Sequence, residues 1–297
     1  MTESNLKKKY LNFIKKQETF GESFKDKLNQ LNNYYLPVCR KLFDQCKFSS
    51  KPMIVGLSGG QGSGKSTIAQ IFKIILQTKF KLKVICFSID DFYKTAKERK
   101  KMSKSIHPLF FTRGVPGTHD CKMLNNVIKI LKRNKFNNMK IPKFDKSVDD
   151  RLKPNNWQKI KMKPDIVIFE GWCVGAKPQS IKNLKIPINS LEKKEDINLT
   201  WRKKVNNELK TSYDKIFKLL DKKIFLKVPS FTYVLKWRML QEKKLKYNSN
   251  KKRMNKSQIK RFIMFYERIT REMIKNYKKN DIILNLDNNH KIKSITL

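Results

Sequence analysis

The sequence lacks paired cysteines and long apolar runs, and each absence excludes a class of protein. There are five cysteines, an odd number, and none belongs to a C-x-x-C motif, so neither a disulfide framework nor a zinc site is indicated. The N-terminal residues lack the apolar core of a signal peptide, and no apolar run approaches the roughly 18 residues that span a bilayer. We therefore expect a soluble, cytoplasmic protein without a membrane partner.

Acidic residues are scarce. The chain has 25 aspartates and glutamates against 68 lysines and arginines, a formal net charge of +43 at pH 7. Such a field attracts nucleic acid or anionic surfaces. The lysines, however, are spread along the whole chain, whereas a binding footprint is clustered on one face or stripe. We therefore attribute the charge to compositional drift, and expect small anionic ligands rather than a specific nucleic-acid partner.

The length and composition are those of a globular protein with a sizeable core. The 297 residues are 39% hydrophobic and 11% aromatic, which suits one large α/β domain or two smaller ones. Residues 1–50 combine apolar positions with many lysines and predict a helical N-terminal extension, followed by one domain over residues 51–297. The oligomeric state is left open, with a monomer favoured.

Apolar strands alternate with helices from residue 53 onward, which predicts βαβ units and a mostly parallel sheet. The expected strands are Met53–Leu57, Val84–Ile89, Asp165–Glu170, Lys223–Val228 and Asp281–Leu286. Helices are expected around residues 68–76 and 123–131 and over residues 201–220, 231–247 and 257–277. The result is a doubly wound α/β fold with five strands and helices on both faces, whose ligands bind at the carboxyl ends of the strands. The polar, basic segment 243–257 is expected to be a loop or a mobile lid.

A complete phosphate-binding motif follows the first expected strand. The string GGQGSGKS matches G-x-x-x-x-G-K-[ST] and leads into an expected helix. In this motif, backbone N–H groups face the phosphates, the lysine neutralises the β- and γ-phosphates, and the hydroxyl ligates magnesium. The motif indicates ATP or GTP, and we predict ATP with Mg²⁺. The expected nucleotide contacts are Gly59, Gly60, Gln61, Gly62, Ser63, Gly64, Lys65, Ser66 and Thr67.

Carboxylates follow two other expected strands at the same edge of the sheet. Asp90 and Asp91 come after Val84–Ile89, and Glu170 ends Asp165–Glu170. A carboxylate beside the γ-phosphate can accept the proton of an attacking hydroxyl or help to hold magnesium. We predict Asp90 as the general base, and Ser66, Asp91 and Glu170 as the metal site. The structural alternatives are a helix N-cap for the aspartates and an ion pair for Glu170.

The order of GGQGSGKS, SIDDFY, RGVPGTHD, PKFDKS, DDR and FEGWCVGAKP resembles D-glycerate 3-kinases of the plant and bacterial type. That family is similar to uridine kinase, phosphoribulokinase and pantothenate kinase. The resemblance covers nearly everything from residue 50 onward, including PINSLEKKED, WRKKVNNEL and VPSFTYVLKWRMLQE. It implies transfer of the γ-phosphoryl group of MgATP to a hydroxyl of a small anionic acceptor, D-glycerate giving 3-phosphoglycerate, with the catalytic aspartate at Asp90.

The resemblance also implies an acceptor pocket and a lid arginine. Arg238, in KWRMLQE, would stabilise charge on the transferring phosphoryl group together with Lys65. The alternatives are a structural hydrogen bond for the histidine of RGVPGTHD, a helix cap for the aspartate after it, and a solvated helix face for Arg238. The acceptor residues implied are Tyr93, Arg113, His119, Asp120, Asp145, Lys146 and Arg151.

Two departures from the family pattern bear on the acceptor. Phe144 stands where many members have tyrosine, and the stretch from Lys146 to Arg151 is short. A first alternative is therefore the same chemistry on a nucleoside, pantothenate or a sugar phosphate. A second is a nucleic-acid-stimulated P-loop ATPase, suggested by the net charge, which would bind nucleic acid with a steep salt dependence.

Overall fold

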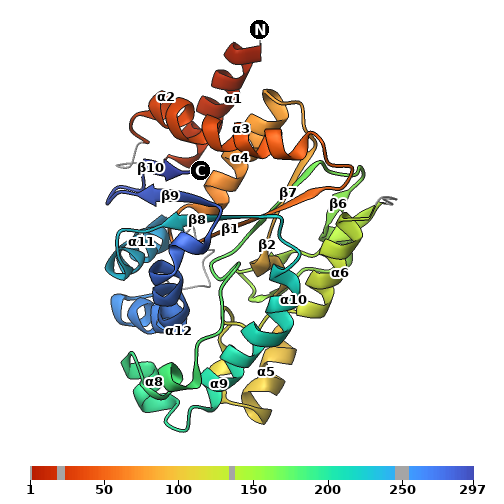
Figure 1. Ribbon diagram of the computed structural model, residues 1–297. Helices are drawn as coiled ribbons and strands as arrows, with labels where there is room; N and C mark the ends of the chain where they lie inside the picture. The colour runs from red at the N-terminus through yellow and green to blue at the C-terminus, as the bar shows by residue number, and fades with distance from the viewer. Residues whose placement is uncertain (1, 19–23, 134–137, 245–253) are drawn as a thin grey trace.

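A six-stranded sheet runs through the centre of the computed structural model, which describes residues 2–18, 24–133, 138–244 and 254–297. The strand order is β10-β9-β8-β1-β7-β2 (Figure 1). All neighbouring strands pair in parallel except β9 and β10, which are antiparallel. The strands are β1 (Met53–Gly59), β2 (Val84–Ser88), β7 (Ile166–Glu170), β8 (Lys222–Lys227), β9 (Ile282–Leu286) and β10 (Ile292–Thr296).

The mostly parallel α/β fold predicted from the sequence is confirmed, and so are the five expected strands. Strands β1 and β7 are buried at every residue, as expected of parallel strands covered by helices on both faces. Alternate residues of β1 belong to different cores, Ile54 to one and Val55 to the other. Strand β10 was not predicted, because only Ile292 of its five residues is buried.

Twelve α-helices are described, and two of them continue through π-helical turns. Residues Leu31–Tyr35 join α2 to α3, and residues Leu209–Tyr213 join α9 to α10, so the helix expected over 201–220 is one continuous unit. The helices are α1 (Thr2–Gln17), α2 (Lys27–Gln30), α3 (Leu36–Cys46), α4 (Lys65–Thr78), α5 (Ala96–Ser105), α6 (Cys121–Leu131), α7 (Ile181–Lys185), α8 (Ser190–Glu195), α9 (Thr200–Glu208), α10 (Asp214–Phe217), α11 (Phe231–Lys244) and α12 (Lys256–Lys275).

The N-terminal helices pack onto the sheet. Tyr10 and Leu42 are buried in the same core as Val55 of β1. The side chain of Gln30 pairs with the backbone of Ile292 in β10, donating to its carbonyl oxygen at 2.8 Å and accepting from its N–H at 2.9 Å. Helices α1 to α3 therefore lie together at one end of the molecule and hold the edge strand, while α5, α8 and α9 lie at the other end (Figure 1). The boundary at residue 50 stays a prediction.

Two short hairpins connect α6 to β7. The first pairs β3 (Met139–Ile141) with β6 (Gln158–Ile160), and the second, inside it, pairs β4 (Phe144–Asp145) with β5 (Asp150–Arg151). The lid expected over residues 243–257 falls largely on residues 245–253, which lie outside the described residues. Among the described helices, none has the length and apolar character that crossing a membrane requires.

Candidate active site

The glycine-rich motif forms a tight turn between β1 and α4. Gly62 and Gly64 have φ values of 75° and 84°, a backbone region that residues with a side chain rarely adopt. A Cβ atom on Gly62 would lie 2.9 Å from the backbone of Trp237 in α11, so the loop also needs glycine to fit beneath that helix. The Lys65 ammonium donates to the Gly60 carbonyl at 2.8 Å. The loop thus holds its own lysine at the place where phosphate oxygens would bind.

Ser66 and Glu170 form the candidate metal site. The Ser66 hydroxyl donates to Oε1 of Glu170 at 2.8 Å. Burial raises the pKa of Glu170, and the nearby Lys65 ammonium opposes that rise. A hydroxyl and a carboxylate side by side suit Mg²⁺, which takes one or two protein ligands and completes its shell with water and phosphate oxygens. No larger group of three or more His, Cys, Asp or Glu side chains suited to a metal occurs in the described part of the chain.

Asp90 and Asp91 lie on a 3₁₀ turn, Ile89–Phe92, directly after β2. Asp91 completes the capping box of that turn, since its Oδ2 accepts from the Ser88 N–H at 3.1 Å, and the same oxygen accepts from Lys143 at 2.9 Å. Asp91 therefore has the structural place in the capped turn that was the alternative for the pair, with Ser88 as the N-cap residue. Direct ligation of magnesium by Asp91 and the base role of Asp90 both stay predictions.

The Asp90 carboxylate receives one donor on each oxygen. The Tyr93 hydroxyl donates to Oδ1 at 2.8 Å, and the Lys146 ammonium lies 2.6 Å from Oδ2. Burial is the largest single influence on the pKa of Asp90 and would raise it. The charge and the hydrogen bond of Lys146, with smaller contributions from His119 and the Tyr93 hydroxyl, together outweigh burial and hold the pKa well below its usual range. Asp90 is therefore an anion, the form that accepts a proton.

Ser66, Asp90, Asp91, Lys146 and Glu170 line one cavity of about 260 Å³. Three motifs that the sequence places after different strands thus converge with Lys146 of the β4–β5 hairpin. The polar side chains that line the cavity are Ser66, Gln70, Ser88, Asp90, Asp91, Lys143, Lys146 and Glu170.

Arg113 lies beside the hairpin. Its guanidinium forms an ion pair with Asp149 and lies 5.7 Å from the centre of the Phe144 ring. The Tyr93 ring contacts the same phenylalanine edge to face, with 5.2 Å between ring centres. Phe144 therefore brings together three of the predicted acceptor residues, because Lys146 follows it two residues later.

His119 is buried and neutral. Only 1% of the residue is exposed, and burial lowers the pKa of its imidazole to about 3. Its Nδ1 lies 2.5 Å from the Tyr213 hydroxyl, and its ring stacks on Tyr93 with 4.5 Å between ring centres. Burial and the contact with Tyr213 therefore favour the structural alternative for His119. Its role in holding an acceptor carboxylate stays a prediction that the geometry does not strengthen.

Three other predicted acceptor residues shape the backbone around the site and do not line the cavity. Asp120 caps α6 by accepting from the Met123 N–H at 3.0 Å, as its structural alternative stated. Arg151 donates to the Tyr93 carbonyl at 2.8 Å. Asp145 accepts from the Ser147 N–H at 2.7 Å in the hairpin turn. Their roles in acceptor binding stay predictions that the geometry does not strengthen.

Arg238 lies on α11 next to the phosphate-binding loop. Its residue is 8% exposed and its guanidinium forms a 2.7 Å ion pair with Glu242, so the alternative of a solvated helix face is wrong. Its backbone nitrogen would lie 3.1 Å from a Cβ atom on Gly62. The arginine thus lies against the nucleotide loop, and its contact with the γ-phosphate stays a prediction.

Sequence reasoning missed Lys143, Asp149 and Tyr213. Each acts through a partner distant in the sequence: Lys143 through Asp91, Asp149 through Arg113, and Tyr213 through the buried histidine. No spacing rule singles out Lys143 in so lysine-rich a chain. Tyr213 carried only a helical pattern, which could not show that its hydroxyl contacts His119 and the Gly117 N–H.

Comparison with known proteins agrees with this geometry. Residues 54–212 match the model of the Phosphoribulokinase / Uridine kinase family. The uncharacterized kinase mug58 of Schizosaccharomyces pombe is 35% identical over 237 residues, which cover 77% of this chain and 83% of that protein. The chloroplastic D-glycerate 3-kinase of Arabidopsis thaliana is 28% identical over 230 residues, 72% of this chain and 48% of that protein. This chain therefore spans about half the length of the plant relative.

A solved structure shares the fold. The D-glycerate 3-kinase from Cryptococcus neoformans superposes with a TM-score of 0.73 at 22% identity, over 88% of this chain and 98% of that one. The architecture is thus that of a P-loop kinase, and kinases of this kind use ATP with Mg²⁺. The chain belongs to the phosphoribulokinase/uridine kinase family and is an ATP-dependent P-loop kinase.

Proposed function

We propose that this kinase phosphorylates a hydroxyl of a small anionic acceptor, D-glycerate, to give 3-phosphoglycerate. One observation carries the proposal: an anionic aspartate, two lysines and the Ser66–Glu170 pair line a single cavity. The aspartate suits a hydroxyl, the cations suit a carboxylate, and the pair suits magnesium. Two relatives that bear the name D-glycerate 3-kinase support the choice of acceptor.

Ser66 and Glu170 would hold the magnesium ion, which would lower the charge repulsion of the triphosphate. Lys65 leaves the Gly60 carbonyl and binds phosphate oxygens. Asp90 accepts the proton of the acceptor hydroxyl, whose oxygen forms the new bond to the γ-phosphorus while the bond to the β–γ bridging oxygen breaks and ADP leaves. Lys146 and Arg113 orient the acceptor through its carboxylate.

A panel of acceptors at equal MgATP tests the proposal. The panel contains D-glycerate, L-glycerate, uridine, pantothenate and ribulose 5-phosphate, with ADP release and the phosphorylated product both measured. We expect D-glycerate to be turned over fastest and 3-phosphoglycerate to form. Absence of D-glycerate turnover together with clear turnover of another compound would overturn the proposed acceptor.

The same assay tests whether the kinase responds to nucleic acid, and a separate measurement tests its location in the cell. We expect added DNA or RNA to leave ATP turnover unchanged at low and at high salt, since we attribute the charge to compositional drift. Salt-dependent stimulation would favour the nucleic-acid-stimulated ATPase instead. We also propose that the reaction takes place in the cytoplasm, although the plant relative is chloroplastic; fractionation of cells that express the tagged chain checks this.

A further inference from the structure

Both carboxylate oxygens of Asp90 already accept a hydrogen bond from a side chain of the protein. Each carboxylate oxygen has a donor, the Tyr93 hydroxyl at 2.8 Å and the Lys146 ammonium at 2.6 Å. An acceptor hydroxyl must give its proton to one of these two oxygens. A base whose charge is compensated by an ammonium at hydrogen-bond distance accepts that proton poorly. One of the two donors must therefore move before the reaction.

Tyr93 is the donor that stays. Its residue is 3% exposed, and its ring is fixed between the stacked His119 ring and the edge contact with Phe144. Its own N–H and C=O are also bound, since the carbonyl accepts from Arg151. Moving Tyr93 would break contacts with three elements of the fold, so it serves to orient Asp90.

Lys146 is the donor that leaves. Its side chain is 60% exposed, whereas that of Asp90 is 24% exposed. It lies in the four-residue connection between β4 and β5, at the end of a hairpin that has only two residue pairs. The ammonium is at the end of a flexible four-carbon stem, so a small movement suffices to exchange one anionic partner for another.

We propose that Lys146 blocks Asp90 until a carboxylate-bearing acceptor draws the ammonium away, so that the kinase couples base catalysis to the charge of its acceptor. The inference rests on the proposed function and names the feature of the acceptor that is recognised. The acceptor carboxylate replaces Asp90 as partner of Lys146, and the acceptor hydroxyl takes the vacated position at Oδ2. Water and neutral alcohols offer no such anion, so Lys146 stays on Asp90 and they react slowly.

Replacement of the lysine by methionine tests this role. In the wild type we expect D-glycerate to be phosphorylated far faster than glycerol, which has a CH₂OH group in place of the carboxylate, and ATP hydrolysis without acceptor to be slow. In Lys146→Met we expect hydrolysis without acceptor and glycerol turnover to rise about tenfold, within the range of a general-base contribution. The ratio of D-glycerate to glycerol turnover should fall by about a hundredfold, because the carboxylate also loses a partner.

Two further variants complete the experiment. Lys153→Met removes an exposed lysine that follows the hairpin, and should leave hydrolysis and the acceptor ratio at wild-type values. Adding Asp90→Asn to Lys146→Met should abolish the gained hydrolysis, because the gain depends on the base. If Lys146→Met only raises the KM for D-glycerate and leaves hydrolysis and glycerol turnover unchanged, the lysine merely binds the carboxylate and the proposal fails.

The hydrolysis measurement separates this inference from the choice of acceptor. Should the wild type not use D-glycerate while Lys146→Met still hydrolyses ATP faster, the proposed acceptor is wrong and the blocking role of the lysine stands. Should D-glycerate be used and hydrolysis not rise, the acceptor stands and the blocking role is wrong.

Discussion

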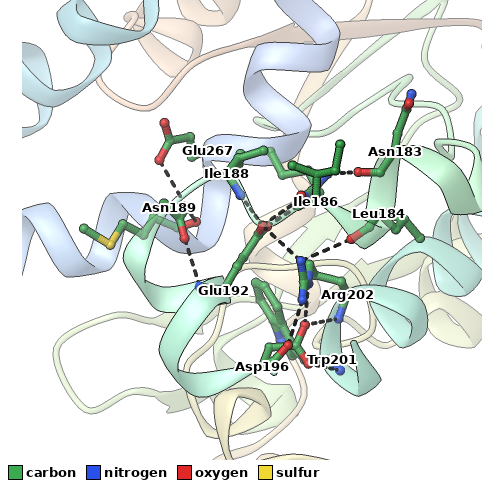
Figure 2. A network of polar contacts seen from close by, with 12 residues as sticks. Asn183, Leu184, Ile186, Ile188, Asn189, Glu192, Asp196, Trp201, Arg202 and Glu267 are labelled. Atoms are coloured by element: carbon green, nitrogen blue, oxygen red, sulfur yellow. Dashed lines mark hydrogen bonds and ion pairs between the residues drawn. The ribbon is translucent and has the colours of Figure 1, made fainter. Parts of the chain in front are cut away.

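The molecule contains two clusters of charged side chains, and they are built in opposite ways. Figure 2 shows the first, in which Glu192 and Asp196 lie beside Arg202 of α9. Glu192 also forms an ion pair with Arg268 of α12. Arg268 donates to both oxygens of Glu192, at 2.8 and 2.7 Å, and Arg202 donates to Asp196 at 2.7 Å. These two carboxylates are each 1% exposed. In the second cluster, the active site, each carboxylate oxygen of Asp90 accepts one side-chain donor, and the side chain of Lys146 is 60% exposed.

The difference separates a charge network that fixes structure from one that exchanges partners. In the buried network the arginines also bind backbone carbonyls, Arg202 that of Leu184 and Arg268 that of Ile186, so few groups could bind anything new. The network ties α8 and α9 to α12, whose Tyr266 donates to the Arg113 carbonyl at 3.2 Å. We infer that the first cluster holds the frame in which the second can rearrange.

The largest effect is expected in the second cluster, the active site. Asp90→Asn removes the base and should reduce kcat by roughly 10²–10⁴. ATP affinity should change little, because the phosphates are bound by the glycine-rich loop. Turnover measured beside ATP binding by calorimetry checks this, and thermal unfolding confirms that the variant is folded. An unchanged kcat would show that Asp90 is not the base.

In the first cluster, the buried network around Glu192 and Asp196, the expected effect is on the free energy of unfolding. Glu192→Gln leaves the buried Arg268 guanidinium without its charged partner and should cost about 3–5 kcal/mol of unfolding free energy. Denaturant unfolding measures the cost. The KM for ATP, measured where the variant is folded, should stay near the wild-type value. A cost below about 1 kcal/mol would mean that the network resembles a surface ion pair.

The sequence predicted those parts of the site whose signal is local. Lys65 and Ser66 belong to one contiguous motif, and Asp90 and Glu170 each end an apolar run, so the strand ends and the parallel sheet were enough to bring them together. Strand β10 was missed because only Ile292 of its five residues is buried, so the segment lacks the apolar pattern of the other strands.

The neutral state of His119 could not be predicted either. It arises from burial, which lowers the pKa of the imidazole, and the hydroxyl that contacts the ring comes from Tyr213, 94 residues away in the chain. A sequence motif shows neither. The buried charge network could not be predicted for the same reason, since it depends on contacts between segments that are distant in the sequence. PINSLEKKED and WRKKVNNEL were noticed as similarities to the family, but only the packing of α8 against α9 and α12 shows that their charges are buried.

A smaller effect is expected where the two clusters meet. Gly114 has a φ of 134°, and a Cβ atom there would overlap the Tyr266 hydroxyl of α12. Gly114→Ala should therefore cost about 1–3 kcal/mol of stability and raise the KM for the acceptor more than that for ATP, because Arg113 is displaced. Gly175→Ala is the matched control: its φ is 80°, but the nearest atom would be 3.7 Å away. Equal changes in both KM values would contradict the link to Arg113.

The smallest effect is expected for a pair with the same geometry in a different environment. Arg261 of α12 donates to both oxygens of Glu195 of α8, at 2.6 and 2.8 Å, so it joins the same helices as the Arg268–Glu192 pair. Its side chains, however, are 49% and 42% exposed. Glu195→Gln should cost less than about 1 kcal/mol, and the cost should shrink further in high salt, because water and ions screen an exposed pair.

The substitution is identical to Glu192→Gln, and both glutamates lie on α8. The difference between the two unfolding free energies therefore measures burial together with the additional contacts of Glu192 with Arg202 and with the Ile188 N–H. A cost for Glu195→Gln that equals the cost for Glu192→Gln would mean that the bidentate geometry, rather than the exclusion of water, makes the network rigid. The active site could then not be distinguished from the network by exposure, and the freedom of Lys146 to leave Asp90 would have to come from its flexible stem alone.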